Sequence, residues 1–154
     1  MVLRPATAEE LAAADEMISA WLASELADND AFLDVTRDAE IPFRWYVRLA
    51  GEQRDFVTIW LTLRQRTLSY ESYVLPAPEE NERELYEYLL RLNHRLVGAQ
   101  FGVGPEDAIY LTGEIGIEAL DEDQLDRIVG TIYEYVEQYF RPAMRIGFAS
   151  RFPG

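Results

Sequence analysis

Four runs of alternating apolar and polar residues lie between residues 31 and 75, and no other feature constrains the fold of this chain as strongly. The runs cover 31–36, 43–49, 55–63 and 67–75, with short turns between them. An alternation with a period of two residues is typical of strands that bury one face. The pattern therefore predicts an antiparallel meander, in which Leu33 and Val35 supply the alternation of the first strand.

Helix start signals flank this meander on both sides. Thr7 and Glu10 form a capping box, which predicts a helix that ends near 28–30. Towards the C-terminus, an acidic cluster that begins at Asp121 opens another helix, and Pro142 is expected to stop it. We interpret the acidic residues at these helix starts as capping and solvated groups rather than metal ligands, because carboxylates are favoured in a first helical turn.

A third helix separates the meander from two further strands. Asn81 repeats the capping pattern before a helix over residues 82–97, and Gly98 is expected at its C-cap. Two short apolar runs, 100–103 and 108–112, then flank a turn. The order of elements is therefore α-ββββ-α-ββ-α. Strands joined by short turns, together with three helices, predict an α+β domain built on an antiparallel sheet.

The length and the charge of the chain limit what it can bind. With 154 residues it has the size of one domain, which we place at residues 1–142, followed by a C-terminal tail at 143–154. The formal net charge is −14, and such a surface repels the phosphates of nucleic acids and of anionic membranes. We therefore expect neither as a partner. No secretory signal or membrane span is visible, which makes the cytoplasm the expected location.

No motif for catalysis or for a cofactor emerges from the sequence. The chain has no cysteine and one histidine, so thiolate chemistry is excluded and a metal site would have to be built mainly from carboxylates. His94 is placed on the polar side of the second predicted helix, beside Glu87 and Arg91, where we expect it to be solvated. The segment 101–104 contains a Gly-x-Gly but precedes a turn, unlike a dinucleotide-binding loop. We expect no enzyme activity, no cofactor and no metal.

The second predicted helix is apolar over a wider arc than one sheet can cover. Its first row, which should face the sheet, is Leu85, Leu89, Leu92 and Leu96. A second row, about 100° round the helix, consists of Tyr86, Leu90, Asn93 and Val97. This second row needs a further contact, either another part of the chain such as its tail or the same helix in a second copy. We favour the second copy and expect a homodimer.

The side of the meander opposite its apolar face carries aromatic and arginine residues. The candidates for partner binding on this side are Tyr46, Arg48, Trp60, Tyr73 and Tyr110. Such side chains combine apolar area with hydrogen-bonding groups, as in protein recognition surfaces. The alternative is an ordinary solvated sheet face, because tyrosine and threonine also favour strands. Both interpretations stay open at this point.

Five segments together form a recognisable pattern: Thr67-Leu68-Ser69-Tyr70, Tyr73-Val74-Leu75-Pro76, residues 81–93, Ile109-Tyr110-Leu111-Thr112-Gly113-Glu114 and residues 120–126. With these segments the chain resembles the YbjN family of small bacterial proteins. The resemblance covers about residues 30–140. It implies a fold similar to that of type III secretion chaperones, which are small acidic homodimers that bind other proteins. That fold has the element order reached above from capping and periodicity, and the family supplies no catalytic residues.

We therefore expect a non-enzymatic, chaperone-like or regulatory domain that binds itself and an unidentified protein partner. In this interpretation the acidic remainder of the surface keeps the complex soluble. The alternative is a small-molecule-sensing regulatory domain with a pocket between the sheet and a helix.

Overall fold

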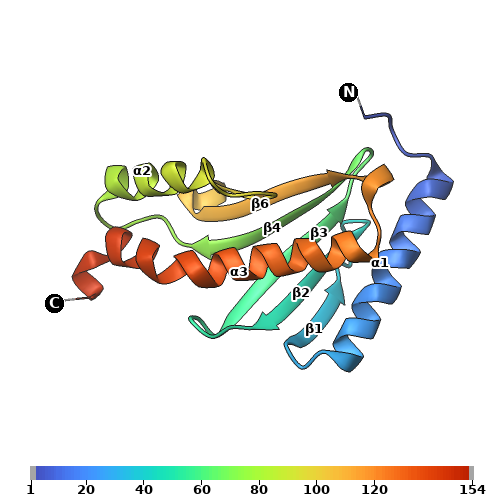
Figure 1. Ribbon diagram of the computed structural model, residues 1–154, viewed down its shortest axis with the longest axis horizontal. Coiled ribbons are helices and arrows are strands. Elements are labelled where there is room, and N and C mark those ends of the chain that lie inside the picture. Colours follow the sequence, from blue (N-terminus) through green and yellow to red (C-terminus); the bar gives the residue numbers. More distant parts are fainter. Residues whose placement is uncertain (1–2, 153–154) are drawn as a thin grey trace.

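A computed structural model describes residues 3–152, which form three α-helices and six strands in the order α-ββββ-α-ββ-α (Figure 1). The helices are α1 (Ala8–Asp28), α2 (Glu82–Asn93) and α3 (Glu122–Gly147). The strands are β1 (Phe32–Arg37), β2 (Arg44–Ala50), β3 (Phe56–Leu63), β4 (Thr67–Leu75), β5 (Gln100–Val103) and β6 (Ile109–Gly116). The predicted α+β class and the predicted order of elements are confirmed.

All six strands belong to one antiparallel sheet. Its order is β1-β2-β3-β4-β6-β5, so β1 and β5 are the edge strands. α3 runs across one face of the sheet, α1 packs beside β1, and α2 packs beside β5 (Figure 1). Both α1 and α2 also contact α3, so the three helices share one core on this face. Within residues 3–152 the opposite face of the sheet carries no helix.

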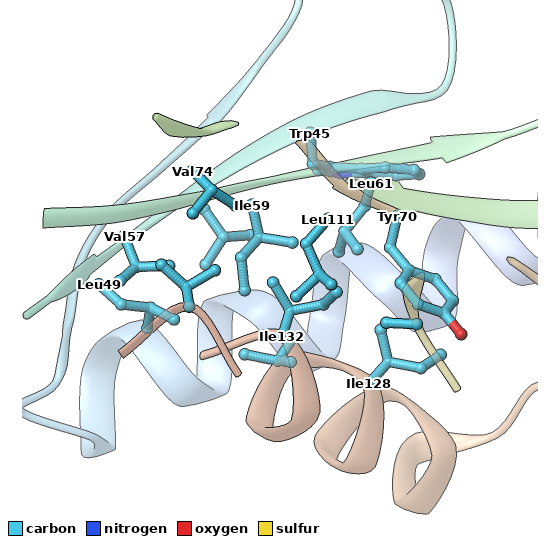
Figure 2. Packing of buried hydrophobic residues seen from close by; sticks show 14 of the residues in the cluster. Trp45, Leu49, Val57, Ile59, Leu61, Tyr70, Val74, Leu111, Ile128 and Ile132 are labelled. Atoms are coloured by element: carbon cyan, nitrogen blue, oxygen red, sulfur yellow. The ribbon is translucent and has the colours of Figure 1, made fainter. Parts of the chain in front are cut away.

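The hydrophobic core lies between the sheet and α3. Figure 2 shows Ile128 and Ile132 of α3 lying against the apolar side chains of the strands. The buried residues of β2 and β3 alternate along each strand as predicted, and include Trp45, Val47, Leu49, Val57, Ile59 and Leu61. Because successive side chains of a strand point to opposite faces, the residues between these positions are directed away from the helices.

The first strand departs from a strict alternation. Phe32 pairs with Leu49 and Val35 pairs with Val47, and an irregularity of the register lies between these two pairs. Phe32 is consequently buried, whereas Leu33 is 44% exposed. The prediction that Leu33 and Val35 share a face is wrong, because a β-bulge adds one residue between the two inward positions.

The predicted helix starts are confirmed at all three helices, but Asn81 does not cap α2 through its side chain. The Thr7 hydroxyl accepts a hydrogen bond from the backbone N–H of Glu10, and the Glu10 carboxylate accepts one from the backbone N–H of Thr7, both at 3.1 Å. Asp121 caps α3 through its carboxylate. Asn81 has a φ of 53° and makes no capping bond to α2. Its side-chain amide instead donates to the carbonyl oxygen of Ile146 in α3, at 2.9 Å.

α2 ends at Asn93, four residues earlier than predicted. Asn93 is half-buried and its side chain is engaged with β5, so the chain leaves the helix there to reach the sheet edge. Gly98 has a φ of 83°, a conformation suited to glycine, but it lies in the connecting turn and not at the helix end. Ala99, the next residue, is fully buried and starts the approach to β5.

α3 continues through Pro142 and ends at Gly147, so the prediction that Pro142 stops the helix is wrong. Ala143, directly beyond the proline, is buried in the core. The carbonyl oxygen of Gly147 accepts hydrogen bonds from the backbone N–H groups of Glu79 and Glu80, at 3.0 and 3.1 Å. These contacts dock the last turns of α3 against the segment before α2. They offset the free energy lost because Pro142 has no backbone N–H to donate to the helix. The predicted boundary between domain and tail at residue 142 therefore falls inside α3.

Candidate interaction surfaces

The outer side of α2 carries one large apolar side chain among charged ones. Leu90 is 67% exposed, although three other leucines of the same helix are buried. Charged and polar neighbours line the surface around it, namely Glu82, Arg83, Glu87, Arg91 and His94. Glu87 and Arg91 form an exposed ion pair at 2.9 Å along the helix. Leu90 is thus an apolar site that residues 3–152 leave uncovered.

A groove between α2 and the edge strand β5 extends this apolar site. It has a volume of about 210 Å³ and is lined almost entirely by apolar groups. Its walls are Tyr86, Leu89, Leu90, Asn93, Phe101, Gly102, Val103 and Ile109. Val103 on β5 is 53% exposed, and a side chain added to Gly102 would meet no atom within 4 Å. We call this surface the α2–β5 groove.

Asn93 holds the helix to the sheet edge. Its side-chain oxygen accepts a hydrogen bond from the backbone N–H of Phe101 at 2.8 Å, and its side-chain nitrogen donates to the backbone carbonyl of Phe101 at 2.9 Å. Both backbone groups belong to the edge strand β5, so the Asn93 side chain occupies the place that a neighbouring strand would take. The amide of Asn93 is therefore committed inside the chain, although the residue lies in the groove wall.

The structure brings together part of the predicted dimer row and separates the rest. Tyr86, Leu90 and Asn93 all line the α2–β5 groove. Val97 lies beyond the end of α2 and is 76% exposed, and its backbone N–H donates to the hydroxyl of Tyr135 in α3 at 3.2 Å. The prediction that Val97 continues the helical row is wrong, because the helix stops before it.

His94 is exposed at the C-terminal end of α2, as predicted. It lies on the outer side of the helix with Arg91 and Glu87. Within residues 3–152, no three histidine, aspartate or glutamate side chains gather into a cluster that could hold a metal ion. In that same part of the chain, no helix is both long enough and apolar enough to cross a membrane.

The helix-free face of the sheet carries two aromatic pairs. Tyr46 and Trp60 meet edge to face with ring centroids 5.7 Å apart, and Tyr73 and Tyr110 do so at 5.6 Å. The register explains both pairs, because Tyr46 is opposite Trp60 and Tyr73 is opposite Tyr110 in neighbouring strands. All four residues were predicted from the alternation of the strands, and the structure places them on one face.

Arginine side chains lie over aromatic rings on the same face. The guanidinium carbon of Arg48 is 4.7 Å from the centroid of the Phe56 ring, and that of Arg44 is 5.7 Å from the Trp60 ring. The N–H of the Arg44 Nε atom also donates to the hydroxyl of Thr62, at 2.9 Å. These contacts hold the arginine stems against the rings and keep the arginines extended over the sheet. We call the surface of Arg44, Tyr46, Arg48, Phe56, Trp60, Tyr73 and Tyr110 the aromatic face.

A loop carboxylate fixes one member of the aromatic face. The hydroxyl of Tyr46 donates to Asp38, which also accepts hydrogen bonds from the backbone N–H groups of Glu40 and Ile41 at 2.8 and 2.7 Å. The bond from Ile41, followed by those from Tyr46 and Glu40, lowers the pKa of Asp38 to about 2. The bond to Asp38 also raises the pKa of Tyr46, together with burial. Tyr46 is therefore a fixed, neutral part of this face.

Sequence reasoning missed two kinds of surface residue. Phe56 is 46% exposed and lies on the aromatic face, and the alternation of β3 already grouped it with Trp60. That signal was sufficient to find it. Val103 and Gly102 had no such signal, because their exposure depends on β5 being the edge of the sheet, which the sequence of β5 does not reveal.

By sequence, the chain is similar to several mycobacterial proteins. The chain is 33% identical over 104 residues to the uncharacterized protein Rv0487 of Mycobacterium tuberculosis, which covers 68% of this chain and 57% of that protein. It is 32% identical over 107 residues to the uncharacterized protein ML2442 of Mycobacterium leprae, with 70% and 58% covered. The matched segment thus spans a little more than half the length of these relatives.

Two solved structures share the fold. One is the ExoU–SpcU complex from the type III secretion system of Pseudomonas aeruginosa, with a TM-score of 0.54, 19% identity, and coverage of 82% of this chain and 97% of the other. The other is the ExsC–ExsE complex, with a TM-score of 0.56, 16% identity, and coverage of 82% and 93%. At this identity the similarity concerns the fold, and it confirms the predicted type III secretion chaperone-like architecture.

A family model covers most of the chain. Residues 14–143 match the YbjN model, which is described as a putative bacterial sensory transduction regulator. This range contains α2, the whole sheet, and α1 and α3 except for a few terminal residues of each. The structural comparisons agree with the element order of the three helices and the six-stranded sheet. The chain therefore belongs to the YbjN family.

Proposed function

We propose that this chain is a non-enzymatic protein-binding domain that acts as a homodimer. The observation that carries the proposal is the exposure of Leu90 beside the α2–β5 groove. The other leucines of α2, Leu85, Leu89 and Leu92, are buried in the core. An apolar site that the chain leaves open, rimmed by charged groups, is typical of a surface that contacts another protein.

A second copy of the same helix fits this surface by charge. The first part of α2 carries Glu82, Glu84 and Glu87 against the single Arg83, whereas Arg91 and, just beyond the helix, Arg95 follow. A twofold axis near Leu90 would run the two helices antiparallel, which sets the acidic end of one against the basic end of the other. Complementary charges at the rim orient the two copies, and burial of Leu90 and Tyr86 supplies the affinity.

The aromatic face fits a different polypeptide. It offers rings held edge to face and arginine side chains spread over them, on the face of the sheet that no helix of residues 3–152 covers. Tyrosine, tryptophan and arginine are enriched at the centres of protein interfaces. The two solved structures with this fold are themselves complexes of two different proteins, ExoU with SpcU and ExsC with ExsE. This fold likeness supports a partner-binding role for the chain.

The dimer is tested by the mass of the protein in solution. We expect sedimentation equilibrium at micromolar concentration to give twice the mass of the chain, and Leu90→Glu to give the monomer, because a buried charge without a partner is costly. Val97→Glu is the matched control, since Val97 is exposed but lies outside the groove. A monomeric wild-type protein, or a Leu90→Glu dimer, would refute the proposed interface.

The aromatic face is tested separately. A photo-crosslinking residue is placed at Tyr73 or at Gln138, which is exposed on α3 on the opposite side of the molecule. We expect one polypeptide of the source cell to crosslink at position 73 only, and Tyr73→Glu to abolish its capture by the wild-type bait. Equal crosslinking at both positions, or capture that Tyr73→Glu leaves intact, would contradict a role for this face.

A further inference from the structure

A second apolar depression lies on the helical side of the molecule, away from both surfaces described above. It is formed between the start of β1, the end of β2 and the middle of α3, with a volume of about 200 Å³. Its lining residues are Asn29, Ala31, Phe32, Leu49, Asp126, Val129, Gly130 and Tyr133. Most of the exposed lining is apolar. We call it the Gly130 cleft.

Gly130 has no role inside the chain that would require a glycine. It lies in the middle of α3, where glycine costs about 1 kcal/mol relative to alanine. A Cβ atom added at Gly130 would meet no atom within 4 Å, and the residue is exposed. Neither a positive φ nor a close packing contact explains it. The missing side chain instead deepens the cleft, because Gly130 forms part of its wall.

The surroundings of the cleft are acidic. Asp126 lines it one helical turn before Gly130, and the exposed Asp28 and Asp30 flank the lining residue Asn29 in the chain. None of these three carboxylates takes part in an ion pair among residues 3–152. The last turn of α1 contains no basic residue, so the negative end of its dipole adds to these charges.

The inner end of the cleft is closed by a tyrosine. The Tyr133 hydroxyl donates to the backbone carbonyl of Ala50 at 2.8 Å, which fixes the ring between α3 and the end of β2. Burial raises the pKa of Tyr133, and the nearby carboxylates of Glu137 and Glu52 raise it further. The cleft therefore has a wall that a backbone hydrogen bond holds in place.

We propose that the Gly130 cleft receives one bulky apolar side chain of a partner polypeptide that carries a basic residue next to it. The apolar interior and the absent side chain of Gly130 make room for the first, and Asp126 with Asp28 and Asp30 attract the second. The volume of about 200 Å³ suits a side chain, since pockets for small molecules usually have about 300–1,000 Å³. This site is independent of the proposed dimer and of the aromatic face.

The test is a titration of the isotope-labelled 154-residue chain with short synthetic peptides, followed by NMR. The probe peptide has one leucine between two arginines; one control peptide has alanine in place of the leucine, and another has glutamates in place of the arginines. We expect the probe to shift the amide signals of Gly130, Ala31 and Tyr133, and both controls to bind at least about tenfold more weakly.

Variants of the protein complete the test. Gly130→Leu fills the cleft and is expected to weaken binding of the probe at least about tenfold, whereas Gln138→Leu, an exposed position of α3 outside the cleft, leaves it unchanged. Asp126→Asn is expected to weaken binding about two- to fivefold, and Glu16→Gln, an exposed position of α1 outside the cleft, is the matched charge control. Gly130→Ala reports on the cleft if Gly130→Leu does not fold, because alanine meets no neighbour there.

Three outcomes would overturn the proposal. The first is a set of shifted signals that lies outside the cleft. The second is equal binding of all three peptides. The third is saturation of the cleft by a small apolar molecule such as toluene, with no gain from the arginines, which would assign it to a small ligand. None of these outcomes bears on the mass of the protein in solution, so the dimer is judged by its own experiment.

Discussion

At the scale of single residues, Asn93 is the link between α2 and the sheet. Its amide satisfies both backbone groups of Phe101 on the edge strand β5, at 2.8 and 2.9 Å. The Phe101 side chain is buried, so these two bonds are shielded from most of the solvent. This arrangement also blocks the middle of β5 against the addition of a further strand.

Asn93→Ala is expected to lower the free energy of unfolding by about 1–3 kcal/mol. The substitution leaves the N–H and the carbonyl of Phe101 without their partner, and unsatisfied polar groups near a core carry a desolvation cost of this order. Urea denaturation measures the change. Gln100→Ala, an exposed neighbour on the same strand, is the control and should change stability by less than about 0.5 kcal/mol. If Asn93→Ala changed stability as little as this control, water would replace the Asn93 amide as the partner of Phe101.

Asp38 makes stability depend on pH at the edge of the aromatic face. Its pKa is lowered to about 2 in the folded chain by hydrogen bonds from Ile41, Tyr46 and Glu40, compared with an ordinary value of 3.8. A carboxyl group with a lowered pKa stabilises the folded state above its unfolded pKa, and this contribution is lost as the pH falls from about 4 towards about 2. Asp38→Asn should therefore make the loss of stability in this pH range less steep. The test measures urea midpoints of unfolding between about pH 4 and about pH 2, with the exposed Asp55→Asn as control. If the midpoints of wild type and Asp38→Asn fell in parallel with pH, Asp38 would not be the source of the pH dependence.

At the scale of elements, α3 shows how packing overrides local preference. The helix spans Glu122–Gly147 although it contains Gly130 and Pro142, the two residue types least favourable in a helix. Its apolar stripe is buried against the sheet, with Leu125, Ile132 and Val136 fully covered. The helix starts and the strands were predictable, because capping and periodicity are local properties of the sequence. The ends of α2 and α3 were not, because contacts with residues far away in the chain decide them.

Pro142→Ala is expected to raise the free energy of unfolding by about 1–2 kcal/mol. Alanine restores a backbone N–H in the helix interior and removes the clash of the proline ring. The higher conformational entropy of the unfolded alanine variant reduces this gain in stability. Thermal or urea denaturation measures the difference. Pro76→Ala, in the exposed connection after β4, serves as control and should not stabilise the chain. If Pro142→Ala destabilises the protein, the proline ring itself packs in a way that alanine cannot replace.

At the scale of the whole molecule, the net charge of −14 opposes self-association. Two copies with this charge repel each other. At 0.1 M ionic strength, salt shortens the range of this repulsion to about 10 Å. The charge pairs proposed along α2 are few and exposed, so each is worth little by comparison. The balance favours stronger dimerisation in salt.

The dissociation constant of the dimer is therefore expected to fall severalfold between about 0.05 M and about 0.5 M sodium chloride. Such salt does not weaken the apolar burial of Leu90 and Tyr86, whereas it largely removes the repulsion between the copies. Sedimentation equilibrium at both concentrations measures the constant, with a neutral osmolyte of matched osmolality as control. A dimer that weakens in salt would show that ion pairs, and not the α2–β5 groove, hold it together.

The sequence by itself determined the α+β class, the order of elements, the starts of α1 and α3, and the members of the aromatic face. These features follow from local periodicity and capping, which act between residues a few positions apart. Only the tertiary structure decided that β5 is an edge strand, that Asn93 ends α2 by binding Phe101, and that α3 passes through Pro142 to Gly147. The physical reason is that burial and hydrogen bonding between distant segments contribute more free energy than the local preference of one residue, and no local pattern records which segments will meet.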